Sequence, residues 1–147
     1  MSATRRKPPV LHALAFALIL DRAGQVLLVR HNYEGRFYAL PGGAVEPGEL
    51  PQEAAVREIR EELGVEARIL RLLSLNSFVL EERYQAHVFL AEITHGVPTC
   101  PTTGEIAEVG WFDPTQLPQP VYRTVAYAIA DAQRGDYGVL REIATAR

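Results

Sequence analysis

Residues 43–65 read GAVEPGELPQEAAVREIREELGV, and this stretch decides how the chain folds and which chemistry it carries. Just before it, Pro41-Gly42-Gly43 predicts a tight turn, where missing side chains let the backbone approach another group closely. Pro51 suits the first turn of a helix and Gly64 suits its end. We therefore expect one helix between these two residues, entered from a glycine-rich loop.

Three glutamates converge on one patch of this predicted helix. Glu58, Glu61 and Glu62 stand at i, i+3 and i+4, so their carboxylates share one side. A separate apolar stripe is formed by Val56, Ile59 and Leu63. Because the two sets lie roughly 120° apart around the axis, the helix can bury one side and present the acids at the wall of a cleft.

A solvated charged face is the alternative explanation of these acids, and it fits poorly. Glu58 and Glu62 are like charges at i, i+4, and the last turn, where Glu61 and Glu62 lie, disfavours negative groups. Acids kept in an unfavourable place are explained by a cation that sits on them. Hard divalent ions such as Mg2+ take oxygen ligands of this kind, so the spacing predicts a metal site.

Length and composition indicate one globular domain. The chain has 147 residues, 48% of them hydrophobic and 22% charged. A net charge of −3 gives no general attraction to nucleic acid or acidic membranes. The single cysteine, Cys100, cannot form an internal disulfide, which suits a reducing cytosol. We expect a cytoplasmic protein with a flexible tail at residues 1–9 and a single domain at residues 10–147.

The rest of the chain is predicted to be mainly strands. An apolar strand at 11–20, joined by a turn to a second at 25–30, predicts a hairpin. The first also imitates the apolar part of a secretory signal, but it is too short to span a bilayer. Further elements are expected as strands at 37–40, 67–79, 83–93 and 106–112, a helical turn at 114–117 and a helix at 121–134. This order predicts an α/β fold with a mixed sheet covered by helices.

Residues 43–65 resemble the signature box of the Nudix hydrolases at every defined position. Leu40-Pro41-Gly42 before the box, and Trp111-Phe112 followed by Leu117-Pro118 after it, are also similar to this family. The resemblance covers most of residues 10–134. It implies a Nudix-type α/β/α sandwich, with a mixed β-sheet between helices, which uses divalent cations to hydrolyse a diphosphate linked to another moiety, X.

The resemblance also implies roles for single residues. The implied metal ligands are the backbone carbonyl of Gly42 and the carboxylates of Glu58, Glu61 and Glu62. Arg57 and Glu49 would pair and fix the helix against the loop, so Glu49 would orient the groups beside the metal. The expected ion is Mg2+, with Mn2+ as the alternative.

Hydrolysis of a phosphoanhydride also needs a group that takes a proton from the attacking water. Glu61 is one candidate. The family often draws this residue from a mobile loop before the last strand, where Glu105 and Glu108 lie in this chain. We favour Glu105, because Gly104 gives its loop freedom. The alternative is that both are surface acids.

Groups outside the box are expected to bind the X moiety. Aromatic faces can stack a base and arginines can fork onto phosphate, although aromatic residues in strands are also common in the core. The substrate-binding candidates are Arg36, Tyr38, Phe78, Arg83 and Tyr84, with Arg30, Tyr33 and Phe37 near them in sequence. His31, His87 and Cys100 are assigned no role.

The pattern predicts a metal-dependent diphosphohydrolase that acts on a small nucleotide, with no nucleic acid or membrane partner. The alternative is a nucleotide-sensing domain without turnover, but such members typically lose a box glutamate that this chain keeps. Cap removal would be expected to bring a basic surface or an added domain, and neither is visible.

The substrate itself stays open among nucleoside triphosphates, nucleotide sugars, ADP-ribose and dinucleoside polyphosphates. ADP-ribose hydrolases of the family often carry a proline some way after the box, whereas none occurs here between Pro51 and Pro98. Dinucleoside polyphosphate hydrolases often carry a tyrosine there, and Tyr84 lies slightly too far on to match. Many relatives are dimers, so a homodimer is left open, although the sequence carries no self-association signal.

Overall fold

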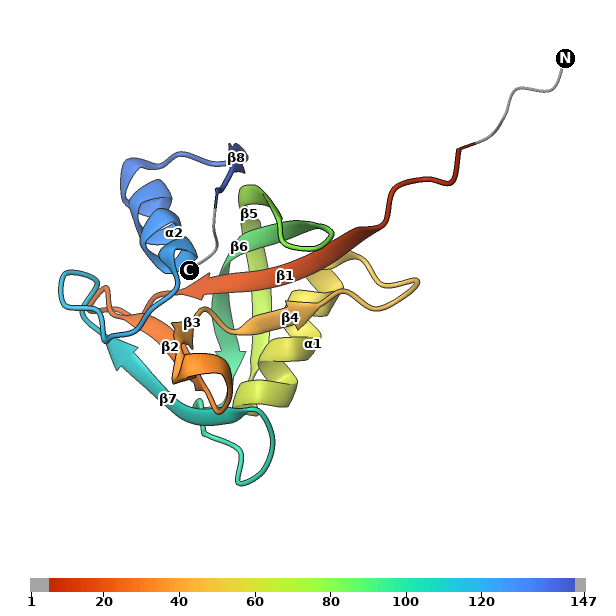
Figure 1. Cartoon of the computed structure of the whole chain (residues 1–147). Coiled ribbons are helices and arrows are strands. Elements are labelled where there is room, and N and C mark those ends of the chain that lie inside the picture. Colours follow the sequence, from red (N-terminus) through yellow and green to blue (C-terminus); the bar gives the residue numbers. More distant parts are fainter. Residues whose placement is uncertain (1–5, 145–147) are drawn as a thin grey trace, which may run out of the picture.

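The computed structural model describes residues 6–144 and folds them into strands flanked by two α-helices (Figure 1). The strands are β1 (Leu11–Ile19), β2 (Val26–His31), β3 (Tyr38–Ala39), β4 (Gly42–Ala44), β5 (Glu66–Val79), β6 (Arg83–His95), β7 (Ile106–Phe112) and β8 (Val139–Glu142). The helices are α1 (Pro51–Leu63), α2 (Arg123–Arg134) and the short 3-10 helix η1 (Glu34–Arg36). Of the predicted tail, residues 1–5 lie outside the described residues, and residues 6–9 are exposed outside any helix or strand.

The described strands form two sheets, and the larger one mixes both strand directions. Its order is β4-β1-β6-β5-β8, with β1 parallel to β6 and β5 parallel to β8. The smaller sheet, β3-β2-β7, is antiparallel. The predicted hairpin between the first two strands is wrong, because β1 and β2 belong to different sheets and are joined only by the bridge between Leu20 and Val26. Strand β1 lies between β4 and β6 instead, where both of its apolar faces are covered.

Helices α1 and α2 cover opposite sides of the strands (Figure 1). Successive side chains of β1 show this, since they point to opposite faces. Ile19 packs in one core with Ile59 of α1, whereas Leu18 packs in a second core with Val125 of α2. The structure therefore confirms the predicted sandwich of strands between helices. Neither of these helices, at 13 and 12 residues, is long and apolar enough to cross a membrane.

Helix α1 begins and ends where the sequence predicts. Near its start, the Glu53 carboxylate accepts a hydrogen bond of 2.8 Å from the backbone N–H of Leu50. At its end, Gly64 takes the left-handed conformation with φ at 69°, and its N–H donates to the carbonyl of Arg60 at 2.9 Å. Its buried side consists of Ala54, Ala55, Ile59 and Leu63. The predicted stripe is thus displaced toward the alanines, since Val56 is only half-buried.

Three segments differ from the predicted elements. Gly42–Ala44, predicted as part of a turn and loop, forms β4 against β1. Residues 139–142 form β8, a strand that the sequence pattern did not indicate. Helix α2 begins at Arg123 instead of residue 121, because Val121 makes a bridge with Tyr38 that holds the chain extended.

An ion pair fastens β8 to the rest of the fold. The Asp131 side chain on α2 is 2% exposed and accepts two hydrogen bonds from Arg141 of β8, at 2.8 and 3.0 Å. The Arg141 guanidinium also lies 4.7 Å from the centre of the Tyr127 ring. A buried carboxylate is costly without a partner, so this pair links α2 to β8 in addition to the pairing of β8 with β5.

Asp131→Ala is expected to lower the free energy of unfolding by about 3 kcal/mol, because it leaves the Arg141 guanidinium without its partner in a largely buried site. Denaturant unfolding of the variant and the wild type measures the difference. Asp136→Ala, at an exposed aspartate just after the same helix, is the matched control and should change stability by less than about 0.5 kcal/mol. Equal losses in the two variants would contradict the assigned role of the pair.

Candidate active site

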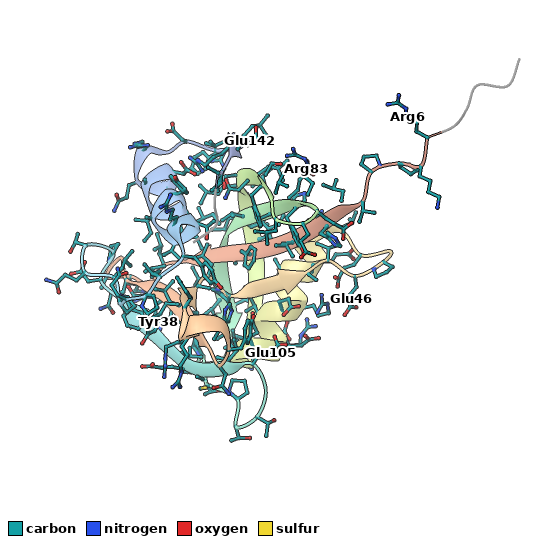
Figure 2. The ribbon with its side chains drawn as sticks, in the orientation of Figure 1. Arg6, Tyr38, Glu46, Arg83, Glu105 and Glu142 are labelled. Carbon is teal, nitrogen blue, oxygen red and sulfur yellow. The ribbon has the colours of Figure 1, made fainter. Side chains whose placement is uncertain are left out.

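The acids that the spacing places on one side of α1 line one cavity of about 560 Å³. Helix α1 supplies one wall, the glycines of β4 supply another, and the chain just before β7 closes a third side. The cavity brings together four carboxylates, which belong to Glu58, Glu61, Glu62 and Glu105. Glu105 lies beside α1 in Figure 2, which shows the segment before β7 reaching toward the helix.

Arg57 ties the loop before α1 to the helix itself. Its guanidinium donates twice to the Glu49 carboxylate, at 2.8 and 3.0 Å, and once to the backbone carbonyl of Ala44 at 2.9 Å. The same group donates to Glu58 at 3.1 Å and to Glu61 at 3.2 Å. The hydrogen bonds from Arg57 hold the pKa of Glu49 below its usual range, and Glu49 raises the pKa of Arg57. Both groups are therefore charged and mutually fixed.

Glu62 is the most deeply placed of the acids. Burial, together with the charges of Glu58, Glu105 and Glu61, raises its pKa to about 8 against the opposing hydrogen bond from Gly42. That bond runs from the backbone N–H of Gly42 to the Glu62 carboxylate at 2.7 Å. Burial likewise raises the pKa of Glu58. The cavity thus holds more negative charge than its own cations balance.

The two glycines of β4 each leave room for a close neighbour. A Cβ atom at Gly43 would lie 2.6 Å from a carboxylate oxygen of Glu58. At Gly42, where φ is 153°, a Cβ atom would collide with the carbonyl oxygen of Ala15. The missing side chain of Gly42 therefore lets β4 pair closely with β1, and that of Gly43 leaves the Glu58 carboxylate in its present place.

The three glutamates of α1 offer the donors that a divalent ion takes, although they are not gathered around a common point. Within residues 6–144, no group of three His, Cys, Asp or Glu side chains is close enough to hold a metal ion as it stands. Arg57 binds both Glu58 and Glu61, and Gly42 binds Glu62. The donor set fits Mg2+, since it consists of carboxylate oxygens around unbalanced negative charge. Metal binding would require these side chains to turn away from their present partners.

The structure separates the two acids that lie near β7. Glu105 lines the cavity, and its backbone carbonyl accepts a hydrogen bond of 2.7 Å from the N–H of Asn32. Glu108 instead accepts hydrogen bonds from Arg30 at 2.9 Å and from the Tyr38 hydroxyl at 3.0 Å. Glu105 therefore belongs to the cavity, whereas Glu108 links β7 to β2 and β3.

None of the five substrate-binding candidates is among the described residues that line the cavity. Tyr38 is held by Glu108, and Arg36 lies at the end of η1. Phe78 is buried and stacks on Tyr84 with 5.4 Å between ring centres. Arg83 donates to Ser77 at 2.8 Å and lies near Glu142, away from Glu105 in Figure 2.

The cavity instead includes His31, the last residue of β2, and Tyr33, two residues further on. His31 was expected to have no role, whereas Tyr33 was named beside the substrate-binding candidates. Their rings are nearly parallel, with centres 4.9 Å apart. A tyrosine and a histidine at i and i+2 were visible in the sequence, but their meeting with the acids of α1 depends on how β2 and α1 pack.

Comparison with known proteins identifies the family. A family model described as NUDIX domain matches residues 10–132, so this chain belongs to the Nudix hydrolase family, whose members generally use a divalent metal. A Bacillus subtilis protein named "Putative 8-oxo-dGTP diphosphatase" is 38% identical over 104 residues, which are 71% of this chain and 68% of that protein. This chain spans only 34 to 65% of the length of the other curated relatives compared.

Solved structures show the same fold. The MutT NUDIX hydrolase of Burkholderia pseudomallei superposes with a TM-score of 0.75 at 28% identity, covering 83% of this chain and 98% of that one. A UDP-X diphosphatase superposes with a TM-score of 0.73 at 27% identity, covering 93% of this chain and 69% of that one. Enzymes named as diphosphatases are thus among the relatives in both sequence and structure.

The metal-free protein is expected to become less stable as the pH rises from about 5 to 8. The folded state raises the pKa of Glu62 from 4.5 to about 8, so it binds the proton more tightly than the unfolded chain, and its free energy of unfolding falls across that window. Denaturant unfolding in the presence of a chelator, at several pH values, measures this decline. Glu62→Gln should show a smaller decline, and identical pH profiles would contradict the assignment.

Proposed function

We propose that this chain is a metal-dependent hydrolase of the phosphoanhydride bond in a nucleoside diphosphate linked to another moiety. The observation that carries the proposal is the meeting of Glu58, Glu61, Glu62 and Glu105 in one cavity. Membership of the Nudix hydrolase family supports the same reaction. The names of relatives that act on 8-oxo-dGTP and UDP-X support a small nucleotide as the substrate.

The residues of the box fall into two groups, one that would bind the metal ion and one that fixes the loop against α1. Glu58, Glu61 and Glu62, with the backbone carbonyl of Gly42, would hold Mg2+ or Mn2+. When bound, such an ion neutralises phosphate charge and makes a water molecule more acidic. Arg57 and Glu49 do not touch the substrate in this account. They fix the loop of β4 against α1, and so position the glycine backbone beside the acids.

Glu105 is the candidate that takes a proton from the attacking water, with Glu61 as the second candidate. Both carboxylates line the cavity. Glu61 is less available to a water molecule, because Arg57 and a metal ion would compete for its oxygens. Glu105 comes from a different segment of the chain. A general base has to reach its proton by geometry first, and Glu105 lines the cavity from the segment just before β7.

The competing function is a nucleotide-sensing domain that binds without turnover. Such a domain has no need of four converging acids, two of which carry raised pKa values because they are buried near like charges. Keeping them costs stability, which is expected where they perform chemistry. The net charge of −3 and the single cysteine support a cytoplasmic protein that acts on small molecules and not on nucleic acid.

The purified protein is expected to hydrolyse at least one member of a panel of nucleoside triphosphates, nucleotide sugars, ADP-ribose and dinucleoside polyphosphates. Release of phosphate or of nucleoside monophosphate should require Mg2+ or Mn2+ and stop with a chelator. Glu62→Gln should lower kcat by orders of magnitude, whereas Glu53→Gln, on the same helix but outside the cavity, should leave it unchanged. Silence across the panel with metal present would reject the hydrolase function.

A matched pair of substitutions tests the general base. Glu105→Gln should lower kcat by about 100- to 10,000-fold, because it removes the acceptor of the proton and keeps the shape of the side chain. Glu108→Gln should change kcat little, since Glu108 is held by Arg30 and Tyr38 outside the cavity. Rates measured under saturating substrate decide between them. If Glu105→Gln retains activity while Glu61→Gln loses it, Glu61 is the base.

A further inference from the structure

His31 and Tyr33 form a parallel aromatic pair inside the same cavity as the glutamates. Their ring centres are 4.9 Å apart and their planes differ by 8°. Tyr33 is 43% exposed, so a large part of its surface is accessible from solvent instead of being packed in the core. Every nucleobase has a flat face that stacks on rings of this kind.

The charge of the cavity also bears on what it can hold. Of the described residues that line the cavity, four are glutamates and none is a lysine or an arginine. The Arg57 guanidinium is already engaged by Glu49 and by the acids of α1. Phosphate groups beyond those that a metal neutralises would meet like charge here. An uncharged aromatic ring of a ligand needs no cation to bind it, so such a ring suits the end of the cavity where His31 and Tyr33 lie.

The backbone around the aromatic pair is fixed to its neighbours. The N–H of His31 donates to the carbonyl of Phe37 at 2.9 Å, which closes the loop that carries Tyr33. The next N–H, of Asn32, donates to the carbonyl of Glu105 at 2.7 Å. The segment that carries the aromatic pair is thus hydrogen-bonded, through Asn32, to the backbone of Glu105.

We propose that the His31–Tyr33 pair is the platform on which the nucleobase of the substrate stacks, while its diphosphate lies at the glutamates of α1. This rests on the proposed function, since it names the part of the substrate that this end of the site holds. Recognition by stacking tolerates different bases and favours the larger purine ring over pyrimidines. Tyr33 is therefore a specificity-determining residue for the base and takes no part in the bond cleavage.

Removal of the Tyr33 ring tests this proposal in two ways. Tyr33→Ala should raise KM for the best nucleotide of the panel by about 5- to 100-fold with little change in kcat, whereas Tyr33→Phe should stay close to wild type. Saturation-transfer NMR with adenosine and guanosine, in the presence of a chelator, reports stacking without phosphate or metal. Both nucleosides should give signals with the wild type and much weaker signals with Tyr33→Ala.

Tyr137→Ala is the matched control, because Tyr137 is 40% exposed and lies against Arg71 instead of in the cavity. It should leave KM and the nucleoside signals unchanged. Equal effects of the two alanine variants, or no nucleoside signal with the wild type, would overturn the platform while the hydrolase function stands. A wild-type protein that hydrolyses nothing in the panel would reject the proposed function, and the NMR experiment would still decide the platform.

Discussion

The bracing of α1 by Arg57 is the interaction on which the rest of the site depends. One guanidinium binds Glu49, the Ala44 carbonyl and two glutamates of its own helix, so the loop after β4 cannot move independently of α1. The glycines of β4 then lie close enough for Gly42 to donate to Glu62. Without this brace, the loop after β4 would lose its side-chain contacts with the helix that carries the acids.

The buried glutamates of the site lower the stability of the folded chain when they are charged. Burial raises the pKa of Glu62 and Glu58, which means that the folded chain would be more stable with these carboxylates neutral. Packing elsewhere offsets this cost. The two cores on either face of β1 provide this packing, and they reach the cavity itself, since Ile106 of the first core and Phe16, which packs against the second, line it. The Asp131–Arg141 pair links α2 to β8 outside the cavity.

The sequence predicted those features that local spacing controls. Helix α1, its end at Gly64 and the long strands β5 and β6 follow from periodicity and glycine conformation, and they were confirmed. Partnerships between distant segments could not be predicted in this way. Strand β1 is apolar on both faces, so its pattern suits β2 or β6 equally well, and the predicted hairpin was wrong. The place of His31 in the cavity likewise depends on tertiary packing and not on its neighbours in the chain.

The parallel pairing of β1 with β6 has a consequence for how the molecule assembles. It runs from Leu11 opposite Arg83 to Ile19 opposite Ala91, so residues far apart along the chain must meet to close the middle of the larger sheet. Folding slows as the separation between contacting residues grows. On the ribosome, the acidic helix and its glycine loop are therefore synthesised before the strand that completes their support exists. The segment from β1 to α1 is therefore made before the residues of β6, with which β1 pairs, have been added.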